Sequence, residues 1–487
     1  MSFRLISFAV LVVLAASCSS AVEESADAAT SSPSSAVDAE PAPETTTSAV
    51  DAVPEDVDPV PDGGVVDFGP APEVPVGDFT PEIAAAIDTV FGTGSLAETR
   101  TNEQNQALVQ LGHSDDVRVA WILLDLLRFP EDRAGAQLLT EGVNTLTDSS
   151  ASVSRAWTEA SNKMIAWDIP APPGYGEIKR QIYSNELAEW GPLFDQSEGM
   201  DWRFVSWGGV SIDDRPYDQT DESCNCIPAA DNPPTQTAAE TTWLQDDDIV
   251  FGVVINGEAR AYPRQIMEVR EMVNDTLGGR DFALPYCTLC GSAQVWFTDN
   301  VPDGVERPVL RTSGLLNRSN KVMYDLNTFS IFDTFLGTAD TGPLAELGVQ
   351  LDQHTVVTST WADWKAEHPD TDALIEDLAL GRDPDFRNGR DAQGPIFPVG
   401  DVDPRLPIQD DVLGVISPGG TPVAFHVATA VGELGRGRAV EAEGVRIVKS
   451  GSGIRAEDTD GNELVAHQAF WFAWSQFYED TEVWPDL

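Results

Sequence analysis

The chain has very little positive charge. It contains 29 Lys and Arg residues against 80 Asp and Glu residues, which gives a formal net charge of −51. Such an acidic chain repels nucleic acid and anionic lipid surfaces, so we expect no nucleic-acid partner. It also has no Gly-x-Ser-x-Gly elbow, phosphate-binding loop or dinucleotide fingerprint, so nothing points to the enzyme classes that carry those motifs. Its five histidines show no metal-ligand spacing.

Long hydrophobic runs are also missing, except for a short one at the start of the chain. Arg4 precedes an apolar stretch at residues 5–16, which is too short to span a bilayer. Small residues then lead to Cys18, in the order Leu14, Ala15, Ala16, Ser17, Cys18. This pattern resembles the lipobox of bacterial lipoproteins, although Leu is commoner where Ala15 stands. We predict a signal peptide at residues 1–17, lipidation of Cys18 and an extracytoplasmic, membrane-anchored protein; the alternative is an ordinary signal peptide.

The stretch that follows Cys18 contains no Lys or Arg and is rich in Ser, Ala, Pro, Thr, Asp and Glu. It has few large apolar residues, so its burial cannot offset the entropy of ordering it. We predict an acidic, disordered tether over residues 18–80. The next segment, residues 81–200, has apolar residues at helical spacing, broken by Gly, Pro and Asp turns, and predicts a helical, repeat-like domain. Residues 114–116 there predict a helix N-terminal cap.

From residue 201 the pattern is typical of β-structure, and the predicted class is therefore α+β. The strands at 249–255 and 258–263 flank Asn256-Gly257, which predicts a type I′ hairpin. A similar hairpin recurs at 411–426, and Trp364, His368 and Thr371 have the same spacing as Trp474, Tyr478 and Thr481. We therefore predict an internal duplication within residues 201–487, with copies at 249–374 and 411–484.

Four cysteines remain besides Cys18, as the pairs Cys224/Cys226 and Cys287/Cys290. Only the first copy carries the Cys-x-x-Cys pair, so we place any active site there. The spacing leaves three alternatives open: structural disulfides, a four-sulfur site for zinc or copper, and a redox pair at Cys287 and Cys290. A disulfide within Cys-x-Cys closes a strained ring, which mildly favours metal binding or pairing between the two motifs.

Around the second cysteine pair the sequence resembles the DUF3179 family, a domain of unknown function. The matching stretches cover much of the region from about residue 200 to 487 and are residues 227–233, 252–263, 273–279, 286–291, 313–316, 320–325, 342–344, 361–371 and 470–474. Some members are labelled selenoproteins. The resemblance therefore favours redox chemistry, because selenium in place of a cysteine sulfur is a better nucleophile and leaving group.

This chain departs from the common family pattern at two places. Arg270-Glu271-Met272 stands where many members have His-Glu-Ile, which weakens a Cys/His metal site. Thr288 stands where many members have Pro after the first cysteine. The resemblance therefore implies a cysteine site without supplying its substrate or electron donor.

Basic and polar residues gather in the insertion of the first copy, in a chain that is otherwise poor in positive charge. They predict a site for an anionic group near the cysteines and are Arg311, Arg318, Asn320, Lys321 and Tyr324. The alternative is a set of salt bridges to acidic residues. The leading hypothesis is a lipoprotein that carries out thiol redox chemistry at Cys287 and Cys290, with an unidentified partner. A metal-binding protein using all four cysteines and a structural surface module are the alternatives.

Overall fold

The computed structural model describes residues 63, 65–92, 100–130, 132–195, 199–220, 224–376 and 394–486, all within the compact unit Asp56–Leu487. The predicted signal peptide, Cys18 and most of the predicted tether lie outside the described residues. Residues 65–80 of that tether have no helix or strand, yet they are held against the helices. The Trp167 indole donates to the Gly69 carbonyl at 2.9 Å, and the Arg118 guanidinium donates to the Gly77 carbonyl at 2.8 Å.

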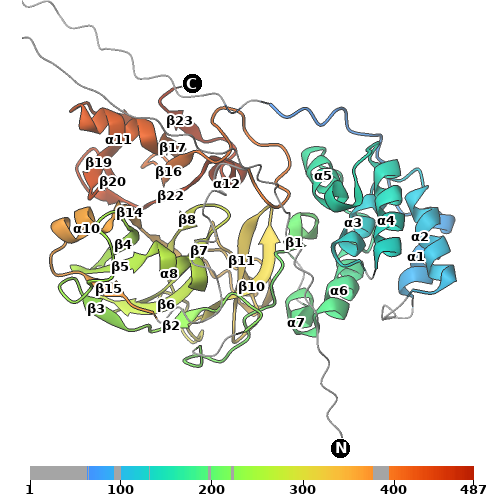
Figure 1. Cartoon of the computed structure of the whole chain (residues 1–487), viewed down its shortest axis with the longest axis horizontal. Coiled ribbons are helices and arrows are strands. Elements are labelled where there is room, and N and C mark those ends of the chain that lie inside the picture. The colour runs from blue at the N-terminus through green and yellow to red at the C-terminus, as the bar shows by residue number, and fades with distance from the viewer. Residues whose placement is uncertain are drawn as a thin grey trace, which may run out of the picture. The chain divides into compact units, whose positions relative to one another are not determined.

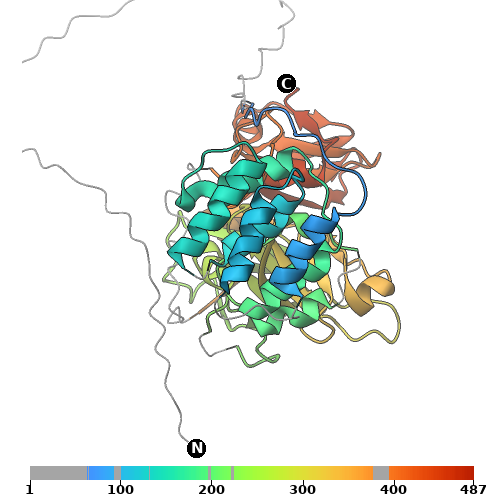
Figure 2. The same ribbon diagram turned by 90° about the vertical axis from the view of Figure 1, so that its right-hand side faces the viewer.

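The prediction of a helical region before the β-rich one is confirmed, and neighbouring helices pack side by side (Figure 2). Its helices are α1 (Pro81–Phe91), α2 (Asn102–Gly112), α3 (Val119–Arg128), α4 (Arg133–Leu146), α5 (Val153–Ala166), α6 (Tyr175–Glu186) and α7 (Gly191–Phe194), with 3-10 turns at Ala188–Trp190 and Trp202–Phe204. The apolar spacing seen in the sequence supplies the buried face of each helix. One cap was predicted wrongly: α3 begins at Val119 without a side-chain cap, because Asp116 instead holds Arg118.

The β-rich region consists of small sheets arranged in a ring, like a propeller (Figure 1). Among the described residues there are five, which we number. Sheet 1 contains β3 (Thr235–Thr237), β4 (Ile249–Ile255), β5 (Glu258–Pro263), β14 (Val357–Thr360) and β15 (Asp372–Leu374). Sheet 2 contains β2 (Ala230–Asp231), β6 (Met272–Leu277), β7 (Arg280–Cys287), β8 (Ser292–Ala293), β9 (Val295–Phe297) and β13 (Asp352–His354).

Sheet 3 lies beside the helices and shares an apolar core with them. It contains β1 (Val205–Trp207), β10 (Leu310–Asn317), β11 (Asn320–Asp325) and β12 (Ile331–Asp333). Sheet 4 contains β16 (Asp411–Ile416), β17 (Pro422–His426), β22 (Ala466–Phe470) and β23 (Glu482–Trp484). Sheet 5 contains β18 (Val440–Ala442), β19 (Val445–Ser450), β20 (Gly453–Asp458) and β21 (Glu463–Leu464).

Sheets 1 and 4 have the same plan. Each contains an antiparallel hairpin, with an antiparallel strand beside its first strand and a parallel strand beside its second. Sheet 1 has β3 as an additional edge strand next to β15. Helices occupy equivalent places in the chain: α8 (Arg264–Arg270) and α11 (Val427–Gly435) after the hairpins, and α10 (Trp361–Glu367) and α12 (Trp471–Phe477) before the last strands. The Asn256-Gly257 turn has positive φ at both residues, as predicted for its hairpin.

Matching side chains support the two sheets. Gly252 and Gly414 each lie under a tryptophan ring, which a Cβ atom at either position would overlap. These rings belong to Trp364 and Trp474, whose indoles donate to Thr371 and Thr481 at 3.0 and 2.9 Å. Apart from β1 and β2, which precede β4, the strands of sheets 2 and 3 are inserted between β5 and β14 together with α9 (Gly342–Glu346), and sheet 5 is inserted between β17 and β22. None of the helices in the described part of the chain is long and apolar enough to cross a bilayer.

Candidate functional site

The Cys287/Cys290 pair lies in a tight turn at the end of β7. β8 folds back so that Ser292 pairs with Cys287, and the Cys290 N–H donates to the Cys287 carbonyl at 3.1 Å. Gly291 completes the turn with a φ of +62°, and a Cβ atom there would press against the Phe470 ring. This turn brings the two sulfur atoms within 2.8 Å of each other. We call Cys287 and Cys290 the dithiol.

Both thiols of the dithiol are buried, but they differ in their contact with a cavity. Cys287 is 2% exposed and lines a cavity of about 270 Å³, whereas Cys290 is fully buried and does not line it. The other residues that line this cavity are mainly apolar or glycine, and they are Gly208, Gly209, Val210, Ile227, Glu271, Thr288, Leu289, Thr312, Gly314, Leu315, Leu316, Lys321 and Phe397. A small group entering the cavity therefore meets Cys287, while Cys290 lies behind it.

A buried ion pair stands beside Cys287 in the same cavity. Lys321 Nζ lies 2.8 Å from Glu271 Oε2, and both side chains are only 5% exposed. Lys321 also donates to the Glu271 carbonyl oxygen at 2.8 Å, and the Thr288 hydroxyl donates to Glu271 Oε1 at 2.9 Å. Glu271 follows α8 in a left-handed conformation, with a φ of +49°. The cavity thus holds a cation and an anion in fixed positions next to a thiol.

These neighbours act on the Cys287 thiol in opposite directions. Burial raises its pKa, and the Glu271 carboxylate raises it further. The hydrogen bond with Cys290, the Lys321 backbone N–H and the Lys321 ammonium lower it, and the net shift of the pKa is downward. A lower pKa increases the fraction of thiolate, which is the nucleophilic form of cysteine.

The tip of the β10–β11 hairpin covers the Cys290 side of the dithiol. Arg318 and Ser319 form the turn with φ values of +48° and +71°. The Cys290 sulfur lies 3.5 Å from the Ser319 carbonyl oxygen and 3.4 Å from Asn320 Oδ1. Asn320 Nδ2 is buried without a hydrogen-bond partner. Rotating this amide by half a turn would aim an N–H donor at the Cys290 sulfur.

The five residues predicted to bind an anionic group do not gather in one place. Lys321 lines the cavity, and Asn320 contacts Cys290. Arg311 is fully buried and donates to both oxygens of Asp231, at 2.8 and 2.6 Å. It therefore forms a structural ion pair, the alternative that the sequence left open, and we do not retain it as a substrate residue.

Tyr324 and Arg318 also point away from the cavity. The buried Tyr324 hydroxyl donates to the Asp213 carbonyl oxygen at 2.7 Å. The Arg318 guanidinium lies over the Phe204 ring, 4.0 Å from its centroid. By contrast, Glu271 and Thr288 belong to the site. The sequence suggested Glu271 as a source of a base or hydrogen bonds and marked Thr288 as a departure from the family pattern, but nothing in it showed that Glu271 faces Lys321.

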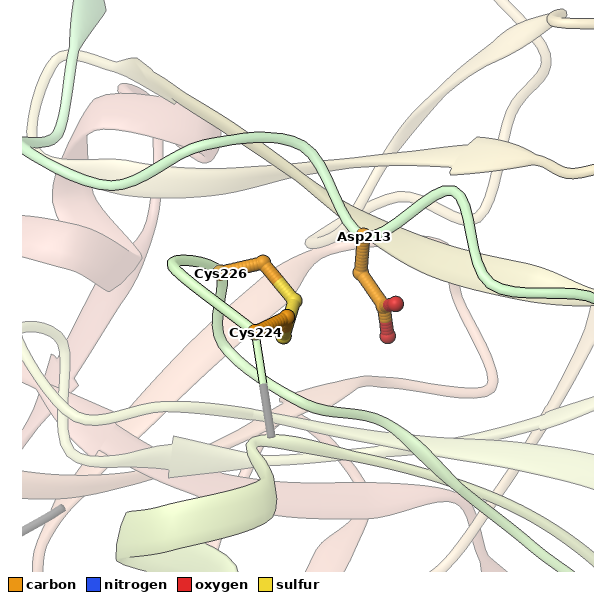
Figure 3. Close-up of side chains that lie close together, drawn as sticks. All are labelled: Asp213, Cys224 and Cys226. Atoms are coloured by element: carbon orange, nitrogen blue, oxygen red, sulfur yellow. A yellow bond between two sulfur atoms is a disulfide. The ribbon is translucent and has the colours of Figure 1, made fainter. Parts of the chain in front are cut away.

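The first cysteine pair forms a different arrangement. Cys224 and Cys226 are joined by a disulfide, and the Asp213 carboxylate lies beside them (Figure 3). That carboxylate already accepts hydrogen bonds from Arg215 at 2.6 and 2.7 Å and from the Ala229 N–H at 2.8 Å. Because Cys224 bonds to Cys226, the pairing between motifs that the sequence mildly favoured is not formed.

The predicted zinc or copper site built from all four cysteines does not fit this geometry. Within the described ranges, the one group of three potential ligands that approach within 4.8 Å is Asp213, Cys224 and Cys226, and it does not include the dithiol. Two sulfurs that share a tetrahedral zinc ion at about 2.3 Å stand about 3.8 Å apart. The 2.8 Å between the dithiol sulfurs is too short for that role and nearer to disulfide contact. We therefore withdraw the prediction of a metal site made of all four cysteines.

The dithiol lies in the part of the chain that matches a known protein family. Residues 224–440, somewhat under half of the chain, match the model of a family described as protein of unknown function (DUF3179). The comparisons with curated proteins and with solved structures found no match. The matched region contains both cysteine pairs, Glu271 and Lys321. The resemblance predicted from the sequence is confirmed: over residues 224–440 this chain is similar to the DUF3179 family.

Proposed function

We propose that the chain is a thiol–disulfide redox protein that acts through Cys287 and Cys290. The observation that carries this proposal is the 2.8 Å contact between two buried sulfurs, of which Cys287 lines the cavity and Cys290 does not, beside the buried Lys321–Glu271 ion pair. Cys287 faces the cavity and serves as the attacking thiolate. Cys290, buried behind it, serves as the resolving cysteine.

The reaction proceeds in two balanced exchanges. The Cys287 thiolate attacks a disulfide of the substrate, forms a mixed disulfide and releases one substrate thiolate, which takes up a proton. Cys290 then loses its proton and attacks the Cys287 sulfur, which forms the Cys287–Cys290 disulfide and releases the second substrate thiol. Two electrons pass from the dithiol to the substrate. A small-molecule or protein dithiol must reduce the protein again, or the sequence runs in reverse.

Single-cysteine variants test this order of events. In the full chain, Cys290→Ser should accumulate a mixed disulfide with an aromatic disulfide such as 5,5′-dithiobis(2-nitrobenzoate), because the resolving thiol is missing. Cys287→Ser should not, because Cys290 does not line the cavity through which the reagent must approach. Mass spectrometry after mild reduction should show a two-hydrogen change in the wild type that both variants lose. Equal trapping at either position, or a dithiol inert to reductant and oxidant, would refute the proposal.

The Cys224–Cys226 pair favours a structural role instead. Its disulfide lies against the satisfied Asp213 carboxylate, and we assign it no part in the exchange. The double variant Cys224→Ser/Cys226→Ser is therefore the matched control: it should cycle like the wild type, and combined with Cys290→Ser it should trap the mixed disulfide as Cys290→Ser does.

We also propose that the protein is exported and lipid-anchored at Cys18. The support is the sequence alone: a short apolar run after Arg4, followed by small residues and a cysteine. An export signal matters to the chemistry, because disulfide exchange is sustained outside the reducing cytoplasm. Full-length protein expressed in a bacterium should enter the membrane fraction with an acylated N-terminal Cys18. Cys18→Ala should abolish that acylation, and an unmodified, uncleaved N-terminus in the wild type would contradict the assignment.

We further propose that residues 249–374 and 411–484 are two copies of one ancestral unit. The support is the shared strand order of sheets 1 and 4, their helices at equivalent places, and the glycine under each tryptophan. The dithiol begins with the last residue of β7, Cys287, whereas β19 ends at Ser450, followed by Gly451, at the comparable place. On this view, redox chemistry was gained or retained in one copy only.

A further inference from the structure

The ring of Phe335 fills a buried position against sheet 4. Phe335 follows β12 in sheet 3 and is fully buried. Its ring stacks on Phe477 at a centroid distance of 4.7 Å and meets His467 edge-on at 5.0 Å. Trp474 and Tyr478 complete its surroundings at 6.2 and 6.4 Å. These four side chains form an aromatic seat for one planar ring.

Sheet 1 has a corresponding position, but no phenylalanine ring fills it. Val357 pairs with Gly252 as His467 pairs with Gly414, and the other three positions follow from the equal spacing along α10 and α12. The counterparts of the residues around Phe335 are Val357, Trp364, Glu367 and His368. All four line one cavity of about 250 Å³. Where sheet 4 holds a ring, sheet 1 therefore has open space.

The size and shape of this cavity suit a ring system. A cavity of about 150 Å³ holds benzene, so about 250 Å³ has room for two fused rings. The His368 ring lies on Trp364, with their centroids 4.1 Å apart, and offers a flat face. Val357 supplies an apolar floor in place of His467.

The rim of the cavity differs from the seat of Phe335 in being polar. An exposed carboxylate, Glu367, replaces the phenyl ring of Phe477, and Glu463 of sheet 5 adds a second exposed carboxylate. Glu367 accepts hydrogen bonds from Ser450 and Gly451, which fixes its position. Arg455 also lines the cavity and lies 4.0 Å from Glu463, so the rim holds two carboxylates and one guanidinium. Carboxylates at the edge of a ring-sized cavity favour ligands whose ring edge carries N–H donors.

We propose that the cavity at sheet 1 is a binding site for a small planar heterocycle with N–H donors, of one or two fused rings. The ring would take the place that Phe335 takes at sheet 4, stack on His368 and donate to Glu367 and Glu463. This site is built from sheets 1 and 5 and does not use the dithiol, so it stands or falls independently of the redox function.

Benzimidazole and naphthalene test the proposal, because they have similar shapes and only benzimidazole has an N–H donor. Ligand-observed NMR titration of the full chain should show benzimidazole binding at one site, with an affinity about tenfold above that of naphthalene. Glu367→Gln and Glu463→Gln should each weaken benzimidazole binding by about tenfold and leave naphthalene binding unchanged. Glu441→Gln is the matched control, since Glu441 is exposed on β18 of sheet 5 but lies outside the cavity.

A blocking variant separates specific binding from surface association. Val254 lies at the edge of the cavity and is 36% exposed, so Val254→Trp can close the entrance without entering the core. With an unchanged thermal midpoint, this variant should lose binding of both probes. Absence of benzimidazole binding at millimolar concentration, or binding that survives both Val254→Trp and the carboxylate changes, would overturn the proposal.

Discussion

Removing the Lys321 ammonium gives the sharpest test of how the cavity is organised. At 2.8 Å and an effective dielectric constant of about 20, the attraction between Lys321 and Glu271 is about 6 kcal/mol, against a desolvation cost of several kcal/mol for each ion. Lys321→Met leaves a buried carboxylate without its partner and should lower the free energy of unfolding by about 3–5 kcal/mol. Glu271→Gln/Lys321→Met removes both charges and should recover most of that loss.

The same variants should shift the reactivity of Cys287 in opposite directions. Lys321→Met removes a charge that lowers the pKa of the Cys287 thiol, so that pKa should rise. Glu271→Gln removes a charge that raises it, so the pKa should fall. The assay is the pH dependence of iodoacetamide labelling, resolved by peptide mass spectrometry, alongside urea unfolding.

The control for this cycle is an exposed lysine pair. Lys365 and Asp246 lie 2.9 Å apart, with side chains 36% and 82% exposed. Lys365→Met should change the free energy of unfolding by less than about 1 kcal/mol, because solvent screens the pair. The reasoning is refuted if Lys321→Met costs no more than Lys365→Met, or if Lys321→Met and Glu271→Gln move the Cys287 pKa in the same direction.

Three further predictions concern stability. Burial raises the pKa of Asp333 to about 6, so the stability that its protonated carboxyl contributes is lost as the pH rises from about 4 to above 6. Asp333→Asn should therefore stabilise the chain by up to about 3 kcal/mol at pH 8 and have little effect at pH 4. Urea unfolding at both pH values measures this difference. Gly252→Ala and Gly414→Ala should each destabilise by about 1–3 kcal/mol in the same assay, because either methyl group overlaps a buried indole; a neutral effect at one site alone would contradict their equivalence. Cys224→Ser/Cys226→Ser should lower the free energy of unfolding by only about 1–2 kcal/mol, seen as a modest fall in the thermal midpoint, because the loop that the disulfide closes is very short. A much larger loss would mean that the disulfide has a wider structural role.

The sequence alone was sufficient for the local features of the chain. Helical spacing predicted the helical region that contains α1 to α5, because an amphipathic helix shows its buried face every three to four residues. Asn256-Gly257 predicted its hairpin, because both residues tolerate positive φ. The cysteine spacing and the motifs around it were also enough to name a family and the dithiol.

Only the tertiary structure decided which of these residues meet. Arg311 and Lys321 both looked like free positive charges, yet Arg311 is neutralised by Asp231 and Lys321 by Glu271, because ion pairing depends on residues 80 and 50 positions away. Cys224 bonds to its near neighbour and not to the dithiol, a choice among three pairings that spacing could not make. The open cavity at sheet 1 could not be recognised from the sequence either. The corresponding position at sheet 4 is filled by Phe335, which comes from the insertion of the first copy and reaches sheet 4 only in the folded chain.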